Sequence, residues 1–314
     1  MKQDKVDFFV VGAARSGTTS LYNYLIQHPE IYLTKIKELN YFSEVESKDL
    51  SLYDKPEKNQ FYHTKIIKSA NTYEKLFEAA NSNQLKGDIS PSYMWDKNTA
   101  QRIYNYNPNA KIIISLRNPV HRAFSHYVMN FGIGQETNLT FKEALNAPKE
   151  NIWGGGNLYI ELGEYYEAIK PYYKYFKPKN IKLLVFEDWT TQKEKTLEDL
   201  FSFLEIDTTF KVSHEVDKNQ KVAYKNIKTL NLLRNPKIKK IIEFFLFDSL
   251  KDSLKTKLFK KEDFSIELDP KTQSELEEYF KPQVEKLNQL LNRNLLEKWN
   301  LEREFCETIN KHNS

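Results

Sequence analysis

Short apolar runs alternate with stretches of helical periodicity over roughly the first 210 residues of the chain. Runs rich in β-branched and aromatic residues predict strands, and they fall at 7–11, 30–33, 87–93, 111–116 and 181–186. Apolar positions three and four apart predict helices, and they fall at 20–28, 73–80, 99–106, 120–130, 165–176 and 197–204. The run 111–116 is almost continuously apolar, as is typical of a parallel strand buried on both faces.

This alternation predicts an α/β fold with a central parallel sheet flanked by helices. After residue 210 the pattern is mostly helical, at 225–258 and 270–299. No internal repeat or low-complexity linker interrupts the chain, so we expect a single domain over 1–314. Its α/β core would span 5–210, and 211–314 would be a mostly helical completion. In such sheets, ligands bind outside the carboxyl ends of the strands.

The first predicted strand runs into a glycine loop and then a helix, an arrangement that presents backbone N–H groups to an anion. Gly12, Gly17 and Thr19 match the P-loop pattern G-x-x-x-x-G-K-[ST], but Thr18 stands where the lysine would be. The missing lysine argues against an ATP or GTP hydrolase, while the loop can still hold one phosphate. The positive charge comes earlier, at Arg15. The alternative is an ordinary β-loop-α connection with small residues for packing.

A second polar group follows the strand 111–116. Arg117 stands at its end, and Ser125 lies eight residues on, about two helical turns into the next helix. An arginine fork and a hydroxyl presented in this way can hold a phosphate at two points. Alternatively, Arg117 is a structural ion-pair residue and Ser125 packs its helix.

Composition narrows the function classes. The net charge of +4 over 314 residues is mild, so we expect an anionic cofactor or an acidic sugar and no nucleic acid. Cys306 is the single cysteine, which excludes an intramolecular disulfide. No apolar window approaches 18 residues and no signal-peptide core precedes the first strand, so we expect no membrane span and a cytoplasmic protein. The Lys/Asn-rich composition suggests a bacterial source.

Other chemistries lack their motifs. The six histidines are scattered without H-E-x-x-H or a Cys/His cluster, so we expect no metal site. The chain also lacks a G-x-S-x-G nucleophile elbow and a glycine-rich dinucleotide fingerprint.

The glycine loop and the segment 116–127 resemble the nucleotide-binding elements of the sulfotransferases that use PAPS (3′-phosphoadenosine 5′-phosphosulfate). The resemblance is strongest to the heparan sulfate type and its bacterial relatives. It implies a P-loop-like sheet, a 5′-phosphosulfate loop at 15–20 and a 3′-phosphate site at Arg117 and Ser125. Residues 214–221 occupy the place of the family's nucleotide-closing loop. The implied cofactor-binding residues are Arg15, Ser16, Gly17, Thr18, Thr19, Ser20, Arg117, Ser125, Asn219 and Lys221.

The segment 37–42 resembles the family's K-E-x-H-x-F element, in which the glutamate is the general base. That role maps onto Glu38, while Lys37 and Asn40 would contact the acceptor. Asn40 replaces the histidine of many relatives, and since an amide does not shuttle protons, Glu38 would act as base alone. Without the resemblance, a solvated Lys-Glu pair beside an aromatic plug is the commoner interpretation of such a segment.

Two further acceptor-side residues come from the same resemblance. Asp88 matches an acidic residue that precedes Ser/Thr-Pro-x-Tyr at the acceptor cleft, although a simple turn aspartate is an equal alternative. Tyr165 matches the family's G-x-Y helix, which we interpret mainly as core with Tyr165 at the cleft.

The resemblance implies sulfuryl transfer from PAPS to a hydroxyl of a carbohydrate or glycoconjugate. Arg15 would stabilise the leaving group electrostatically only, because a guanidinium with a pKa of roughly 12.5–13.8 is a poor proton donor. No metal is required. Two alternatives stay open: a P-loop-type nucleotide kinase whose lysine is replaced, and a nucleotide-binding protein without catalysis. The sequence leaves the acceptor and the oligomeric state open.

Overall fold

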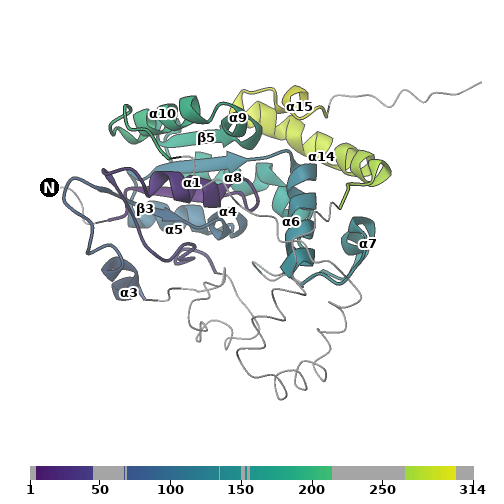
Figure 1. Cartoon of the computed structure of the whole chain (residues 1–314), viewed down its shortest axis with the longest axis horizontal. Helices are drawn as coiled ribbons and strands as arrows, with labels where there is room; N and C mark the ends of the chain where they lie inside the picture. Colours follow the sequence, from purple (N-terminus) through teal and green to yellow (C-terminus); the bar gives the residue numbers. More distant parts are fainter. Residues whose placement is uncertain are drawn as a thin grey trace, which may run out of the picture.

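The fold is described from a computed structural model, over residues 5–44, 67, 69–133, 135–149, 153, 156–213 and 266–301. Within these residues, five parallel strands form one sheet in the order β2-β3-β1-β4-β5 (Figure 1). The strands are β1 (Phe8–Gly12), β2 (Ile31–Leu33), β3 (Leu85–Ile89), β4 (Lys111–Leu116) and β5 (Ile181–Val185). This architecture confirms the predicted α/β fold with a central parallel sheet.

The sheet is buried on both faces because its central strands β1 and β4 are mostly apolar, and all of Phe8–Gly12 and 112–116 are buried. Side chains alternate between the faces, so Phe9 and Ile112 belong to one core cluster while Phe8 and Ile113 belong to the other. The larger cluster is covered by α4 (Ser92–Trp95), α5 (Thr99–Tyr106), α6 (Pro119–Ile133), α8 (Tyr165–Tyr175) and α14 (Pro270–Leu291). The smaller cluster is covered by α1 (Thr18–Leu25), α9 (Phe186–Thr191) and α10 (Lys193–Leu204).

The remaining described helices are short. They are α3 (Ala70–Lys75), α7 (Phe141–Asn146), α15 (Leu295–Lys298) and two 3-10 turns, η1 (Glu161–Gly163) and η2 (Pro178–Asn180). The helix expected at 73–80 instead begins at its Ser69 cap, where the side chain accepts from Thr72 N, and ends at Lys75. Phe77 is nevertheless only 2% exposed, because apolar spacing reports burial and not the helical hydrogen bonds. The short helices α4 and α9 were not predicted.

The C-terminal helical part packs onto the sheet's larger cluster. The buried residues Leu276, Phe280, Val284 and Leu287 of α14 follow helical spacing and face α6 and α8. The helix expected over 270–299 is divided in two at Asn292, which adopts the left-handed conformation (φ 49°) that commonly ends a helix. The predicted helix 225–258 and the predicted ligands Asn219 and Lys221 lie outside the described residues.

The strand order creates a switch point between β1 and β4. From β1 the chain builds β3 and β2 on one side, and it then crosses to build β4 and β5 on the other. The carboxyl ends of these two strands are directly joined, because Ala13 N donates to Ser115 O (2.6 Å) and Ser115 Oγ donates to Ser16 O (2.7 Å). A crevice at such a switch point is where open α/β sheets bind ligands.

Candidate functional site

The glycine loop leads from β1 into α1. At Gly17 the backbone is left-handed and leaves no room for a side chain. Gly17 is the residue before α1 and has φ 81°. A Cβ atom there would lie 2.1 Å from Cζ2 of Trp189. No side chain caps this helix, and the first turn of a helix leaves its N–H groups without internal partners. The end of α1 therefore offers backbone donors and a partial positive charge to an anion.

Side chains of the predicted loop differ in their accessibility. Ser16 is fully buried and Thr18 is 5% exposed, so their side chains are not presented to a ligand. The backbone N–H of Ser16 donates to Ala13 O at 3.2 Å, a bond that an anion at this N–H would share or replace. Thr19 is exposed and Ser20 is half-buried at the start of α1.

The structure brings Arg15, Arg117 and Ser125 together from three separate elements. Nε and Nη2 of Arg15 donate to Ser125 Oγ at 3.3 and 3.1 Å, and its Nη1 donates to Met129 Sδ at 3.2 Å. Nη1 of Arg117 donates to the carbonyl oxygen of Arg15 at 3.2 Å. The two strand-end arginines and the helix hydroxyl thus share one place at the switch point.

This place has an excess of positive charge. Partial burial, and then the charge of Arg117, lower the pKa of Arg15. Burial also lowers the pKa of Arg117, although the charge of Glu187 opposes the shift. Behind them, Arg122 is fully buried; burial is the main cause that lowers its pKa to about 10, and the charges of Arg15 and Arg117 lower it further. All three side chains stay cationic at neutral pH, and such a cluster favours a multiply charged anion.

The position of Arg117 depends on residues that sequence analysis did not connect with it. Its guanidinium lies over the Phe186 ring, 4.6 Å from the centroid. Glu187 accepts from Asn118 N (3.0 Å) and from Trp299 Nε1 (3.1 Å), which ties the end of β4 to α9 and to the C-terminal segment. The Phe-Glu-Asp-Trp sequence after β5 can be recognised in the sequence. Its contacts with Arg117, Asn118 and Trp299 become visible only in the structure.

Tyr165 lies behind Arg117. Its hydroxyl donates to Arg117 O (2.8 Å), it is 2% exposed, and burial raises its pKa to about 12. This burial agrees with the interpretation of Tyr165 as mainly a core residue, and its contact with the acceptor stays a prediction.

Glu38 lies at the carboxyl end of β3, the strand beside β1. Its backbone N–H donates to Ile89 O (3.2 Å), and its own φ is 62°. The carboxylate is largely buried, with 7% of the residue exposed, and its Oε1 is 2.6 Å from Nζ of Lys37. The candidate base thus stands at the same edge of the sheet as the arginines, on the neighbouring strand end.

Asn40 and Asp88 lie in the interior beside this loop. Asn40 is fully buried, and its Oδ1 accepts from Ser92 Oγ (2.6 Å). Asp88 is 2% exposed and accepts hydroxyl hydrogen bonds from Tyr73, Tyr93 and Ser90. Burial raises its pKa to about 6, and the three hydrogen bonds oppose that shift. Both side chains therefore have partners inside the protein, and their contact with a sugar stays a prediction.

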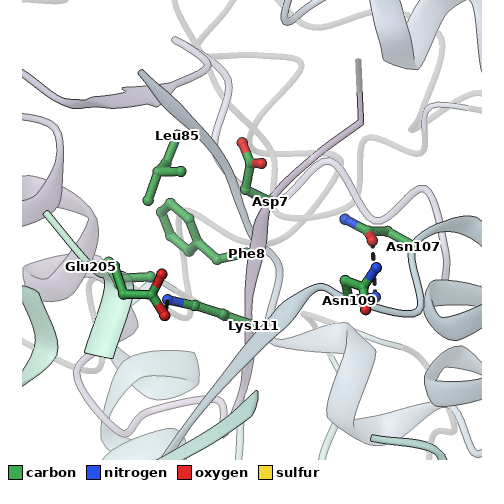
Figure 2. Close-up of a pocket in the computed structure, with 8 residues that line it drawn as sticks. Asp7, Phe8, Leu85, Asn107, Asn109, Lys111 and Glu205 are labelled. Atoms are coloured by element: carbon green, nitrogen blue, oxygen red, sulfur yellow. Dashed lines mark hydrogen bonds and ion pairs between the residues drawn. The ribbon is translucent and has the colours of Figure 1, made fainter. Parts of the chain in front are cut away.

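A cavity of about 420 Å³ opens at the other edge of the sheet (Figure 2). Its lining includes Asp7, Phe8 and Lys111 at the amino ends of β1 and β4, and the ammonium of Lys111 is paired with Glu205 at 2.9 Å. Because parallel sheets bind ligands at their carboxyl ends, we place the functional site at the arginines and not in this cavity.

The described ranges contain neither a cluster of metal ligands nor a membrane-spanning helix. Among those residues, no group of three or more His, Cys, Asp or Glu side chains is placed to hold a metal ion. None of the described helices combines the length and the apolar character that crossing a bilayer requires.

Comparison with known proteins agrees with this geometry. The model of the sulfotransferase domain family matches residues 5–290. A membrane-associated sulfotransferase, kil1, of Dictyostelium discoideum is 29% identical over 217 residues, which are 60% of this chain and 41% of that protein. Human heparan sulfate glucosamine 3-O-sulfotransferase 6 is 23% identical over 171 residues, which are 53% of this chain and 42% of that protein. The chain thus spans less than half the length of these curated relatives.

A solved sulfotransferase structure extends the likeness to the whole fold. The crystal structure of a sulfotransferase from Alicyclobacillus acidocaldarius superposes with a TM-score of 0.68 at 27% identity, over 94% of this chain and 99% of that one. Family model, relatives and fold agree, and the chain belongs to the sulfotransferase family.

Proposed function

We propose that the protein transfers a sulfuryl group from PAPS to a hydroxyl of a carbohydrate or glycoconjugate. The observation that carries this proposal is the meeting of Arg15, Arg117 and Ser125 beside the uncapped end of α1. A nucleotide with phosphates at both its 3′ and 5′ positions needs two anion sites on neighbouring strand ends, and this arrangement supplies them.

Each anion site binds one phosphate group of PAPS. Backbone N–H groups of residues 16–19 hold the 5′-phosphate, with the accessible hydroxyls of Thr19 and Ser20 close to it. Arg117 and Ser125 hold the 3′-phosphate through charge-assisted and hydroxyl hydrogen bonds.

Arg15 stabilises the negative charge that develops on the leaving adenosine 3′,5′-bisphosphate. Its pKa is lowered from the usual value but stays far above neutrality, so it acts as a fixed cation and keeps its proton. Preorganised charge of this kind acts most strongly in the transition state, where the leaving oxygen gains its electrons.

Glu38 is the general base. As the acceptor oxygen attacks sulfur in line, a new O–S bond forms and the S–O bond to the 5′-phosphate breaks, with its electron pair going to the leaving bisphosphate. The acceptor proton passes to the Glu38 carboxylate, whose charge is stabilised by Lys37 at 2.6 Å. Asn40 and Asp88 support this loop, and Tyr165 supports Arg117.

The acceptor class has support from the relatives and from the charge of the chain. Relatives with carbohydrate acceptors in their names include human carbohydrate sulfotransferase 15, at 28% identity over 38% of this chain and 26% of that protein. The charge of +4 suits an acidic sugar. A cytoplasmic location stays a prediction.

Incubation with radiolabelled PAPS and a panel of polysaccharide, glycolipid and phenolic acceptors tests the proposal. Label in a carbohydrate acceptor supports it, and label confined to phenols would overturn the acceptor class. A parallel thermal-shift comparison sets adenosine 3′,5′-bisphosphate against ATP with Mg²⁺. Stronger stabilisation by ATP would favour the kinase alternative, and bisphosphate binding without transfer to any acceptor would favour a binding protein.

A further inference from the structure

The buried carboxylate of Asp88 accepts three hydroxyl hydrogen bonds close to the site, and the mechanism above does not use it directly. Asp88 pairs with Phe9 in the register of β3 and β1, one residue before the end of β3. Its Oδ2 accepts from Tyr73 (2.9 Å) and Tyr93 (2.6 Å), and its Oδ1 accepts from Ser90 (2.7 Å). Three hydroxyl donors on one buried carboxylate exceed what a turn aspartate needs.

Two of these hydroxyls also accept hydrogen bonds from the loop that contains Glu38. Ser90 Oγ accepts from the backbone N–H of Asn40 at 3.2 Å, and the Tyr93 hydroxyl accepts from the N–H of Tyr41 at 3.1 Å. A hydroxyl has one proton, and here that proton is donated to Asp88. The oxygen lone pairs of Ser90 and Tyr93 therefore face the loop, and each chain runs from amide to hydroxyl to carboxylate with cooperative polarisation.

The loop needs such anchoring because its backbone is strained. Glu38 and Asn40 both have positive φ, 62° and 53°, in the left-handed region that is unfavourable for a residue with a side chain. Strained residues persist where surrounding contacts hold them. A further hydrogen bond, from Glu38 N to Ile89 O at 3.2 Å, comes from the same strand end, and Ser92 Oγ donates to Asn40 Oδ1.

We propose that Asp88 is a positioning residue for Glu38: through the Ser90 and Tyr93 hydroxyls, it holds two consecutive loop amides and so fixes where the base stands. The inference rests on the proposed function for its catalytic part, since Glu38 is the base there. Asp88 touches no substrate in this scheme, and its carboxylate acts through the loop alone.

The chain offers a matched control. Tyr73 is as buried as Tyr93 and donates the same kind of hydrogen bond to the same oxygen of Asp88, but its hydroxyl accepts from no loop amide. Tyr73→Phe therefore removes one bond to Asp88 and leaves both relays in place, whereas Tyr93→Phe and Ser90→Ala each interrupt one relay. Asp88→Asn disturbs both.

Amide hydrogen exchange of the full chain tests the anchoring without relying on activity. We expect faster exchange at Asn40 and Tyr41 in Asp88→Asn, at Tyr41 in Tyr93→Phe and at Asn40 in Ser90→Ala, with Tyr73→Phe like the parent. Equal acceleration in Tyr73→Phe and Tyr93→Phe, or none in any variant, would overturn the inference. Hydrogen exchange is measured without catalytic turnover. The radiolabel assay therefore tests the proposed function separately from this inference.

The catalytic part is tested by a double-mutant cycle on kcat. Misplacing a reacting group by about 1 Å can cost roughly 100-fold, so we expect kcat to fall on the order of 10- to 100-fold in Asp88→Asn, with the affinity for adenosine 3′,5′-bisphosphate unchanged. In a Glu38→Gln background the same substitution should have little further effect, because the group it positions is already gone. Full additivity of the two losses would show that Asp88 acts elsewhere.

Discussion

The two neighbouring strand ends of this site are built in opposite ways. At the ends of β1 and β4, Arg15 and Arg117 lie near the buried cation Arg122. Burial lowers the pKa of all three, and the charge of Arg117 lowers the pKa values of Arg15 and Arg122 further. At the end of β3, a buried carboxylate has its hydrogen bonds supplied by protein hydroxyls. In the proposed mechanism a bound anion supplies the partners of the first region, whereas the protein itself supplies those of the second.

The difference follows from what each region has to do. A donor site must bind and release a multiply charged nucleotide, so its favourable interactions are kept for the ligand. A base has to stand at one fixed point, so its loop is held by internal bonds that compensate for strained backbone at Glu38 and Asn40. Substitutions should therefore weaken ligand affinity in the first region and the catalytic rate in the second.

The largest expected effect is on the rate, at the base. Glu38→Gln keeps the size of the side chain but removes its ability to accept a proton, so kcat should fall roughly 100- to 10,000-fold. Bisphosphate affinity, measured by calorimetry, should not change. The exposed Glu44 of the same segment, changed to Gln, is the control. Transfer at the parent rate in Glu38→Gln would assign the base elsewhere.

A substitution in the glycine loop tests whether the donor region depends on its tight packing. Gly17→Ala places a Cβ 2.1 Å from Trp189 in a left-handed conformation. Strain and overpacking together predict a loss of about 2–5 kcal/mol in the free energy of unfolding. Urea denaturation measures it. A variant as stable as the parent, with normal bisphosphate binding, would contradict the close approach of α9 to this loop.

Removal of the strand-end arginine tests the assignment of the 3′-phosphate. Arg117→Ala loses charge-assisted hydrogen bonds worth about 1.5–3 kcal/mol, so the Kd of adenosine 3′,5′-bisphosphate should rise roughly 10- to 150-fold. The Kd of 5′-AMP should hardly change, because that ligand lacks the 3′-phosphate. Lys142→Ala, which removes a positive charge between α7 and α14, controls for net charge. Equal losses for both ligands would place Arg117 at the 5′ end instead.

The smallest expected effect is a dependence of stability on pH, which comes from the buried carboxyl group of Asp88. Burial raises the pKa of Asp88 to about 6, above the roughly 3.9 of an unfolded aspartate. A raised pKa means that the folded protein binds this proton more tightly, so the group's favourable contribution is complete below about pH 4. It is lost as pH rises through about 6.

The check is the stability difference between the parent and Asp88→Asn, from urea unfolding at several pH values. Relative to the variant, the parent should lose at most about 1.4 kcal/mol per pH unit between pH 4 and 6 and then level off. The side chains that face Asp88 are Tyr73, Tyr93 and Ser90, which stay neutral over this interval. A pH-independent difference would show that Asp88 stays ionised throughout.

Prediction from the sequence succeeded best where local chemistry decides the outcome. The bounds of β4 and α5 match the predicted segments 111–116 and 99–106, since apolar runs and helical spacing are properties of neighbouring residues. Arg15, Arg117 and Ser125 also lie together in the structure, because strand ends of a parallel sheet meet at one edge.

The sequence could not indicate the internal partners of the polar side chains near the site. Asn40 accepts from Ser92 and Tyr165 donates to the Arg117 carbonyl, and both contacts join residues that are far apart in the chain. Nothing near Asp88 in the sequence indicates that Tyr73 and Tyr93 both direct their hydroxyls at its carboxylate.

By itself, the sequence determined the strands, the glycine loop and the kinds of charge that follow each strand, because these depend on spacing along the chain. Tertiary structure alone decided which polar groups are left for a ligand and which are used up inside. Asn118 meets Trp299 across 181 positions and Ser92 meets Asn40 across 52. A buried polar group forms hydrogen bonds with the partners that lie within about 3 Å of it in the folded protein. Those partners are determined only when the helices pack against the sheet.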